Sequence, residues 1–319
     1  MKNECEILDC FGQSPLEKVK PPGFSHKSGG FLFEGRSMME RIALYNDSFQ
    51  NWKSHDIQKA QLILTDLPYQ LGNNMYGSNP SWYVGGDNKN GESKLAGKSA
   101  FDTDTKAGFR ISEFFHFCSN LLKKEPKETN SAGCMFLFCA FEQIEELKHY
   151  ASEYGFKNSQ VFIFYKNYSA QVLKANMRAV GNFETAIMFY RDKLPKFRNN
   201  KKMVFTCQPW VDDKTTPKIH ATQKPVPLLE SIIRTYTDID DVVIDCCAGS
   251  GSSLLAAGNL GRRAYGFELK REFVRGFYEK LYPLIQEDIF IKAEREDKKI
   301  RQMELWGCLK RHTKKGTEG

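Results

Sequence analysis

The stretch VVIDCCAGSGSSLLAAG, residues 242–258, limits the fold more than any other part of the chain. A run of β-branched residues predicts a strand that ends at Asp245, and Gly249 and Gly251 let the backbone come close to a ligand. A helix of leucine and alanine then begins at Ser252. A strand, a glycine-rich turn and a helix in this order predict a nucleotide or nucleoside site.

The rest of the chain alternates apolar strands with amphipathic helices. Strands are expected at 41–45, 60–64, 134–141, 161–166, 185–191 and 264–268, and helices at 111–124, 142–155 and in the segment 220–237. Alternation of this kind predicts an α/β protein with a doubly wound, largely parallel, Rossmann-like sheet.

The domain organisation follows from where this alternation starts and stops. Residues 1–35 are a polar lead-in, and 36–290 form one α/β domain. Within it, 72–108 is an irregular insertion rich in Gly, Asn, Ser and Lys. A second, short segment, 191–219, holds the most basic part of the chain, and 291–319 is a basic tail expected to be helical.

Composition narrows the class of protein. A hydrophobic content of 41% in 319 residues is enough to bury a core. No stretch approaches the roughly 18 apolar residues of a membrane span, and the N-terminus lacks a signal sequence, so a cytoplasmic protein is expected. The nine cysteines form no CxxC pair and the six histidines show no ligand spacing. We therefore expect reduced thiols and no metal site.

The glycine-rich turn admits two kinds of ligand. A dinucleotide fingerprint would place glycine or alanine where Leu254 stands, and an acidic Asp245 ahead of the turn would repel a pyrophosphate. The same carboxylate would attract the positively charged end of S-adenosylmethionine, which is therefore the favoured ligand. Glu268 ends the next strand, where an acidic residue accepts hydrogen bonds from a ribose.

Two more motifs complete a recognisable set. TDLPYQ, residues 65–70, ends a buried strand with an acid, a proline and an aromatic, and HATQKPVPLL precedes the glycine-rich unit. With IDCCAGSGSS, these stretches resemble the catalytic, TQKP and donor motifs of the amino-group DNA methyltransferases, which methylate adenine N6 or cytosine N4. Because the catalytic motif comes first in the chain, the sequence is similar to the circularly permuted beta group.

The resemblance implies the residues of the site. The catalytic set comprises Asp66 and the Leu67 carbonyl as acceptors for the target amine, together with Pro68 and Tyr69, the last as a stacking ring. The donor-binding set comprises Asp47, Thr222, Lys224, Pro225, Asp245, Ala248, Gly249, Gly251, Ser252 and Glu268. Within that set, Asp47 is expected at the adenine amine of the donor, and Thr222 and Lys224 near its methionine carboxylate.

Two positions depart from the family pattern. Leu67 replaces the first proline of the catalytic motif, and Cys246 and Cys247 stand where Pro-Phe is common. Residue 67 is expected to contribute only its backbone carbonyl, which any residue supplies. Leu67→Pro is therefore expected to preserve or raise activity. The loss of an aromatic beside the donor is expected to affect donor affinity.

The substrate implied is double-stranded DNA, with the target base flipped out of the duplex. The net charge of +7 fits a polyanionic partner. The resemblance makes 191–219 the candidate target-recognition segment, with the insertion 72–108 as the alternative. Expected DNA contacts are Lys196, Arg198, Lys201 and Lys202 in the basic segment 191–202, and Trp82 and Tyr83 in the insertion. A homodimer and a companion restriction endonuclease are further candidate partners of what the resemblance identifies as a prokaryotic or phage-encoded protein.

Adenine N6 is the favoured target, because an acidic first residue with a final tyrosine is typical of adenine enzymes in this family. Cytosine N4 stays open as the alternative. RNA or protein methylation, and a catalytically decayed relative that only binds DNA, are less favoured, because Asp66, Tyr69 and the donor motif are intact. The target sequence is not readable from the chain.

Overall fold

The computed structural model describes residues 41–68, 109–167, 182–198, 205–220 and 222–286, all of which belong to the unit Arg36–Gly319. The predicted lead-in, the insertion 72–108 and the basic tail lie outside the described residues. No helix among the described residues is long and apolar enough to cross a membrane.

A single eight-stranded sheet organises the described residues, with strand order β1-β8-β7-β2-β3-β5-β4-β6. The strands are β1 Ile42–Tyr45, β2 Leu62–Asp66, β3 Cys134–Cys139, β4 Asn158–Tyr165, β5 Phe183–Tyr190, β6 Cys207–Pro209, β7 Val242–Asp245 and β8 Arg263–Phe267. Strands β1, β8, β7, β2 and β3 pair in parallel, so their carboxyl ends meet at one edge of the sheet. Strand β5 runs antiparallel to both β3 and β4.

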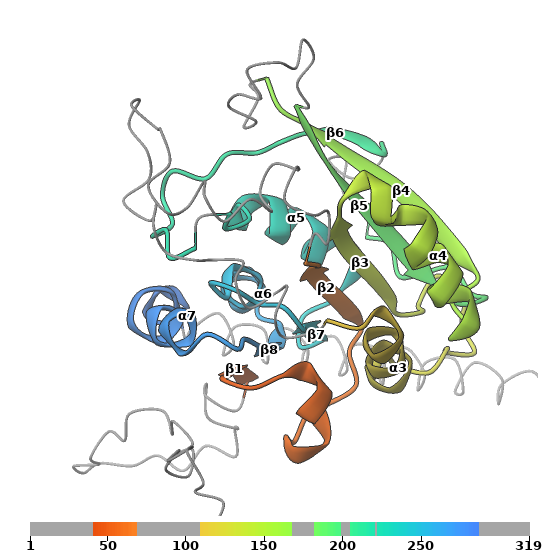
Figure 1. The fold of residues 1–319 in the computed structure, drawn as a ribbon, viewed down its shortest axis with the longest axis horizontal. Coiled ribbons are helices and arrows are strands. Elements are labelled where there is room, and N and C mark those ends of the chain that lie inside the picture. Colours follow the sequence, from red (N-terminus) through yellow and green to blue (C-terminus); the bar gives the residue numbers. More distant parts are fainter. Residues whose placement is uncertain (1–40, 69–108, 168–181, 199–204, 221, 287–319) are drawn as a thin grey trace, which may run out of the picture. The chain divides into compact units, whose positions relative to one another are not determined.

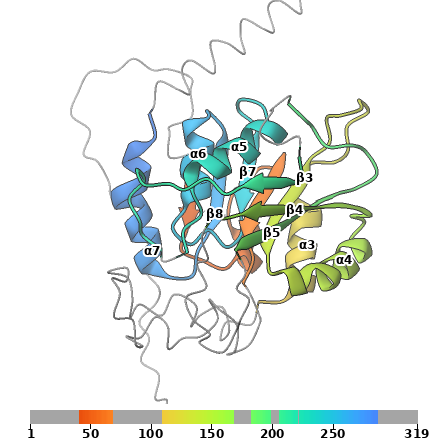
Figure 2. The same ribbon diagram turned by 90° about the horizontal axis from the view of Figure 1, so that it is seen from above.

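Helices cover both faces of the sheet, as Figures 1 and 2 show. On one face lie α5 Val226–Tyr236, α6 Ser252–Asn259 and α7 Arg271–Gly276, followed by a π-helical turn Phe277–Leu281 and a 3-10 turn Tyr282–Leu284. On the other face lie α3 Ile111–Leu121 and α4 Ile144–Glu153, with short 3-10 turns Phe49–Ser54 and Phe141–Gln143. Each face has its own apolar core, so the doubly wound α/β class is confirmed.

Burial follows the period of each strand. Strand β3 is buried at every position because both of its faces are covered, as expected of a central strand. Along β2, Leu62 and Leu64 enter the core under α5 and α6, whereas Ile63 enters the core under α3. The following Asp66 returns to the α5 and α6 face at the carboxyl end of the strand, where ligands bind in open α/β sheets.

The structure differs from the sequence-based expectations in the last part of the sheet. The antiparallel β5 makes the sheet mixed at this end, and the three-residue β6 was not predicted. Strand β6 is too short to show any alternation, and it is added to the sheet only by pairing with Ile163 to Tyr165 of β4.

Candidate active site

The glycine-rich turn connects β7 to α6 at the carboxyl edge of the sheet. Gly251 caps α6 with φ of 76°, a left-handed conformation that favours glycine. A Cβ built at this position would lie 2.4 Å from Cδ2 of Phe277, so the ring closes over the turn where a side chain would stand. Gly249 is also left-handed, with φ of 53°.

The Asp245 carboxylate accepts hydrogen bonds that hold this turn in place. Its Oδ1 accepts hydrogen bonds from the Thr65 hydroxyl at 2.7 Å and from the Cys247 amide at 3.1 Å, and its Oδ2 accepts one from the Ser253 hydroxyl. Burial raises the pKa of Asp245 to about 6, although these donors oppose the shift. At 5% exposure the carboxylate organises the backbone of the turn, and its predicted direct contact with a donor stays a prediction.

Ala248 and Gly251 hold the turn through backbone hydrogen bonds. The Ala248 amide donates to the Phe267 carbonyl at 2.9 Å, and the Gly251 amide donates to the Ala248 carbonyl at 2.8 Å. Ser252 is buried in the first turn of α6. These bonds fix the turn against β8.

Glu268 and Asp47 stand on either side of a pocket next to the turn. Glu268 accepts hydrogen bonds from the amides of Gly249 at 2.9 Å and Lys270 at 2.8 Å. Asp47 accepts from Asn51 at 2.7 Å and lies 2.9 Å from Nε2 of His55. The pocket is lined by Asp47, Ser48, Phe49, Gln50, Pro68, Phe109, Cys246, Cys247, Phe267, Glu268 and Leu269.

Several features of this pocket fit a nucleoside. Its two acids end β8 and follow β1, which are adjacent in the sheet, so one can reach a ribose while the other reaches a base. Phe109 and Phe267 supply apolar walls, and Cys247 faces the same space where the family pattern has an aromatic. Hydrogen bonds from Asn51 and His55, and one from the Ser48 amide, oppose burial and lower the pKa of Asp47, so the carboxylate is held as an acceptor.

The segment predicted to be catalytic begins at Asp66, on the strand next to β7. The Leu67 amide donates to the Phe138 carbonyl at 2.9 Å, and the Leu67 side chain is buried, at 3% exposure. The Pro68 carbonyl accepts a hydrogen bond from the Gln143 side chain at 2.9 Å, which ties the segment to the start of α4. Tyr69 lies outside the described residues.

These contacts give the leucine a role that its carbonyl alone does not have. Proline at position 67 would remove the amide that bonds Phe138, and it would replace a buried aliphatic side chain. The expectation that Leu67→Pro preserves or raises activity therefore omitted a structural cost.

Lys224 forms an ion pair with Asp66, the predicted catalytic carboxylate. Its Nζ is 2.6 Å from Oδ2 of Asp66 and 3.1 Å from Oε2 of Glu184, and its side chain is 10% exposed. The predicted position near the methionine carboxylate of a donor stays a prediction, while the contact with Asp66 is an addition to it. Glu184 was not assigned from the sequence, although a carboxylate in the apolar strand FETAIMFY was a usable signal.

The rest of the TQKP segment shapes the entrance to α5. Thr222 donates its amide to Nδ1 of His220 at 3.2 Å, and Pro225 precedes the first residue of the helix. Burial, with Lys270, Lys224 and Lys218 nearby, lowers the pKa of His220 to about 4. The imidazole is therefore neutral at pH 7.

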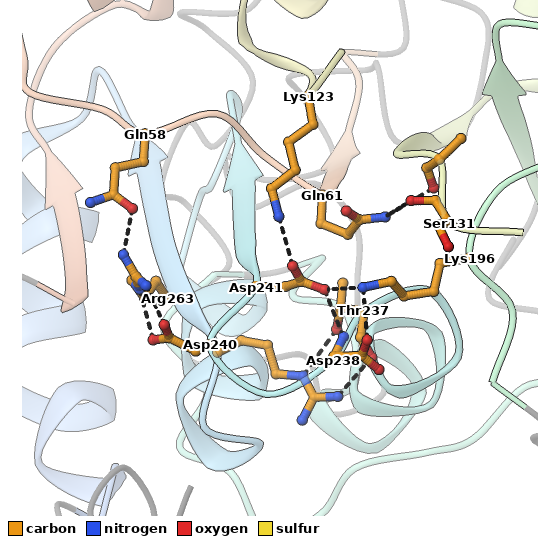
Figure 3. A network of polar contacts seen from close by, with 12 residues as sticks. Gln58, Gln61, Lys123, Ser131, Lys196, Thr237, Asp238, Asp240, Asp241 and Arg263 are labelled. Atoms are coloured by element: carbon orange, nitrogen blue, oxygen red, sulfur yellow. Dashed lines mark hydrogen bonds and ion pairs between the residues drawn. The ribbon is translucent and has the colours of Figure 1, made fainter. Parts of the chain in front are cut away.

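Two predicted DNA contacts lie elsewhere. Lys196 is only 12% exposed and its Nζ is 2.8 Å from Asp238 and 2.7 Å from Asp241, a network that Figure 3 shows. Arg198 holds Asp238 through two bonds of 2.6 and 2.5 Å. Asp241 immediately precedes β7, so this network belongs to the edge opposite Asp66.

Lys196 is paired with Asp241, whose side chain is 11% exposed, so a contact of Lys196 with phosphate would first have to break a largely buried ion pair. This pairing makes Lys196 a poor phosphate ligand, whereas Arg198 is 55% exposed and its predicted DNA contact stays a prediction. The other predicted contacts, Lys201, Lys202, Trp82 and Tyr83, lie outside the described residues.

No cluster of His, Cys, Asp and Glu among the described residues is arranged to hold a metal ion. The described sheet, the glycine-rich turn with its two acids and the carboxylate on the adjacent strand define a Rossmann-like protein of the nucleoside-donor methyltransferase class. Residues 60–279 match the family model of DNA methylase, so the chain belongs to this family, whose methyl donor is S-adenosylmethionine. The fold also has the expected permuted order, because β2, which ends at Asp66, precedes β7 and its glycine-rich turn in the chain.

Individual relatives agree with the family. The chain is 41% identical over 64 residues to the type II methyltransferase M1.MboII of Moraxella bovis, a match to 20% of this chain and about a quarter (25%) of that relative's length. It is 25% identical over 269 residues to M2.DpnII of Streptococcus pneumoniae, covering 78% of this chain and 93% of that protein. The solved M1.HpyAVI–SAM complex superposes with a TM-score of 0.52 at 21% identity, over 75% of this chain and 98% of that one, and shares its fold.

Proposed function

We propose that this chain is a site-specific DNA methyltransferase that transfers a methyl group from S-adenosylmethionine to N6 of adenine. The observation that carries the proposal is the place of Asp66 at the carboxyl end of β2, on the strand adjacent to the donor turn of β7. A flipped base bound at this edge meets an acceptor on one strand and the methyl donor on the next.

The reaction requires the lone pair of an exocyclic amine to be localised, because it is delocalised into the ring. If the two N–H groups donate to the Asp66 carboxylate and the Leu67 carbonyl, the lone pair of the nitrogen points away from both acceptors. The hydrogen bonds of Leu67 and Pro68 to Phe138 and Gln143 support this role, since they fix the backbone that carries the second acceptor.

The sulfonium of the donor supplies an electrophilic methyl group. The amine nitrogen forms a bond to the methyl carbon while the carbon–sulfur bond breaks, and its electron pair stays on sulfur. The nitrogen then carries a positive charge and loses one proton, for which Asp66 is the acceptor already in contact with the amine. Glu268 and Asp47 hold the ribose and adenine of the donor through hydrogen bonds.

Cytosine N4 is the second candidate, because the same two acceptors suit its amine. The solved PvuII DNA methyltransferase, described as cytosine-N4-specific, superposes with a TM-score of 0.52 at 17% identity over 79% of this chain and 91% of that one. Adenine is preferred because the motif DLPY has an acidic first residue and a final tyrosine, the combination typical of adenine enzymes in this family. A companion endonuclease belongs to the proposal, since several relatives are named type II methyltransferases.

The experiment is the Asp66→Ala variant, compared with Glu145→Ala as a control at an exposed carboxylate paired with Lys148 on α4. We expect Asp66→Ala to lose methylation of DNA by a factor of at least about 100, because an acceptor to the reacting amine is gone. Donor affinity, measured by calorimetry, should stay within about threefold of the parent, a change of under about 1 kcal/mol. Methylation at the parental rate would remove Asp66 from its role.

A further inference from the structure

One row of side chains crosses the catalytic edge of the sheet on the face covered by α5. Asp66 of β2 and Phe138 of β3 are register partners, so their side chains share a face. Phe138 pairs with Ala186 of β5, and Glu184 lies two residues from Ala186 on that same face. The row therefore runs from Asp66 through Phe138 to Glu184.

The row continues onto β4. Glu184 is the register partner of Phe164, and Lys166 follows Phe164 by two residues at the end of the strand. Nζ of Lys166 lies 2.5 Å from Oε1 of Glu184 and 4.3 Å from the centre of the Trp210 ring. Glu184 therefore forms one ion pair with Lys166.

Lys224 lies across the row from the loop before α5. Its ammonium contacts Asp66 at 2.6 Å and Glu184 at 3.1 Å, and it lies 5.2 Å from the centre of the Phe138 ring. Four charged groups therefore alternate in sign from Asp66 through Lys224 and Glu184 to Lys166. Their side chains are between 10% and 30% exposed, so the attractions are only weakly screened by water.

The charges explain how a carboxylate is kept in this place. Burial alone would raise the pKa of Glu184, but the ammonium groups of Lys224 and Lys166 outweigh it and lower the pKa. A lysine with a flexible four-carbon stem needs a second anchor if it is to hold one orientation. Glu184 is that anchor, because its Oε2 lies 3.1 Å from Nζ of Lys224.

We propose that Glu184 is a positioning residue for methyl transfer, which acts through Lys224 to hold the Asp66 carboxylate in the orientation that receives the target amine. The inference rests on the proposed function. Lys224 engages Oδ2 of Asp66, which fixes the plane of the carboxylate with its other oxygen and remaining lone pairs directed to the amine. Glu184 contacts neither the base nor the donor in this role.

The test is Glu184→Gln in the full chain, an isosteric change that removes the charge. The single-turnover rate of DNA methylation is expected to fall about 10- to 100-fold, or about 1.4 to 2.7 kcal/mol, while the donor dissociation constant stays within about threefold of the parent. Glu184→Asp keeps the charge and should recover a part of the rate. Lys166→Met, on the other side of Glu184, is the matched control and should lower the rate less than Glu184→Gln.

A double-mutant cycle separates positioning from a general structural role. Lys224→Met should lower the single-turnover rate, and adding Glu184→Gln should cost nothing further, because Glu184 acts only through Lys224. The inference would be overturned if the rate losses of Lys224→Met and Glu184→Gln multiplied in the double variant. It would also be overturned if Glu184→Gln left the rate unchanged, or if its loss of rate followed from lost donor binding. A parent protein that fails to methylate DNA would overturn the proposed function as well, and only that result would do so.

Discussion

Gly251→Ala tests the packing of the donor turn most simply. The substitution adds one methyl group at a residue whose φ is 76°, where the new Cβ would meet the Phe277 ring at distances of 2.4, 2.9 and 3.0 Å. Two costs add up. The left-handed conformation costs an alanine about 1 to 2 kcal/mol, and overpacking against a fully buried ring costs about 1 to 3 kcal/mol. We expect the free energy of unfolding to fall by about 2 to 5 kcal/mol in total.

Gly155→Ala separates these two costs. Gly155 has φ of 84°, and a Cβ built there meets nothing within 4 Å. This variant carries the backbone cost alone, together with the same entropy change of the unfolded chain. The difference between the two variants therefore measures the contact with Phe277, and it should be about 1 to 3 kcal/mol.

The assay is urea-induced unfolding of both variants, followed by donor binding by calorimetry. Gly251→Ala should weaken donor binding because the turn must move away from Phe277, whereas Gly155→Ala should not. Phe277→Leu should relieve the clash. Gly251→Ala should therefore lower the free energy of unfolding less in the Phe277→Leu background than in the parent. If Gly251→Ala costs no more than Gly155→Ala, the ring does not close the turn as described.

Two further predictions concern the catalytic edge. Because the pKa of His220 is lowered to about 4 from an unfolded value of 6.5, its contribution to stability is present above pH 6.5 and is lost as the pH falls toward 4; the parent should therefore lose about 2 to 3 kcal/mol more of unfolding free energy between pH 7 and 4.5 than His220→Gln, and equal losses would contradict the shift. Leu67→Pro should lose about 1 to 3 kcal/mol of stability, because the Phe138 carbonyl loses its donor. The folded fraction should keep its methylation rate, because Pro68 still restrains residue 67 and the Pro68 carbonyl still accepts a hydrogen bond from Gln143. A large loss in that fraction would show that the leucine has a role in catalysis.

The donor turn could be predicted from sequence because its determinants are contiguous. A β-branched strand, Asp245, two glycines and a helix lie within 17 residues, and local conformational preference decides their arrangement. The position of Glu268 beside this turn was also predictable, because the second strand of such a unit lies at a regular separation from the turn. The role of Asp245 was less predictable, since the hydroxyl of Thr65 comes from a strand far away in the chain.

The four alternating charges of Asp66, Lys224, Glu184 and Lys166 were also not predictable, because these residues lie far apart in the chain. Glu184 and Lys166 come together only through the antiparallel pairing of β4 and β5, and both reach Asp66 only through Lys224 from the loop before α5. The basic segment 191–202 shows the opposite case. Counting its charges pointed to DNA, but the fold places Asp238 and Asp241 beside Lys196, and nearby opposite charge changes what a cation can bind.

The most direct test of the account is a methylation assay with base analysis. The protein is incubated with unmethylated DNA and S-adenosylmethionine that carries a labelled methyl group, and the DNA is digested to nucleosides for mass spectrometry. We expect the label in N6-methyldeoxyadenosine, at a rate that Asp66→Ala abolishes. Label in N4-methyldeoxycytidine would correct the base. No label in DNA, from protein that binds the donor, would contradict the proposal that this chain methylates DNA.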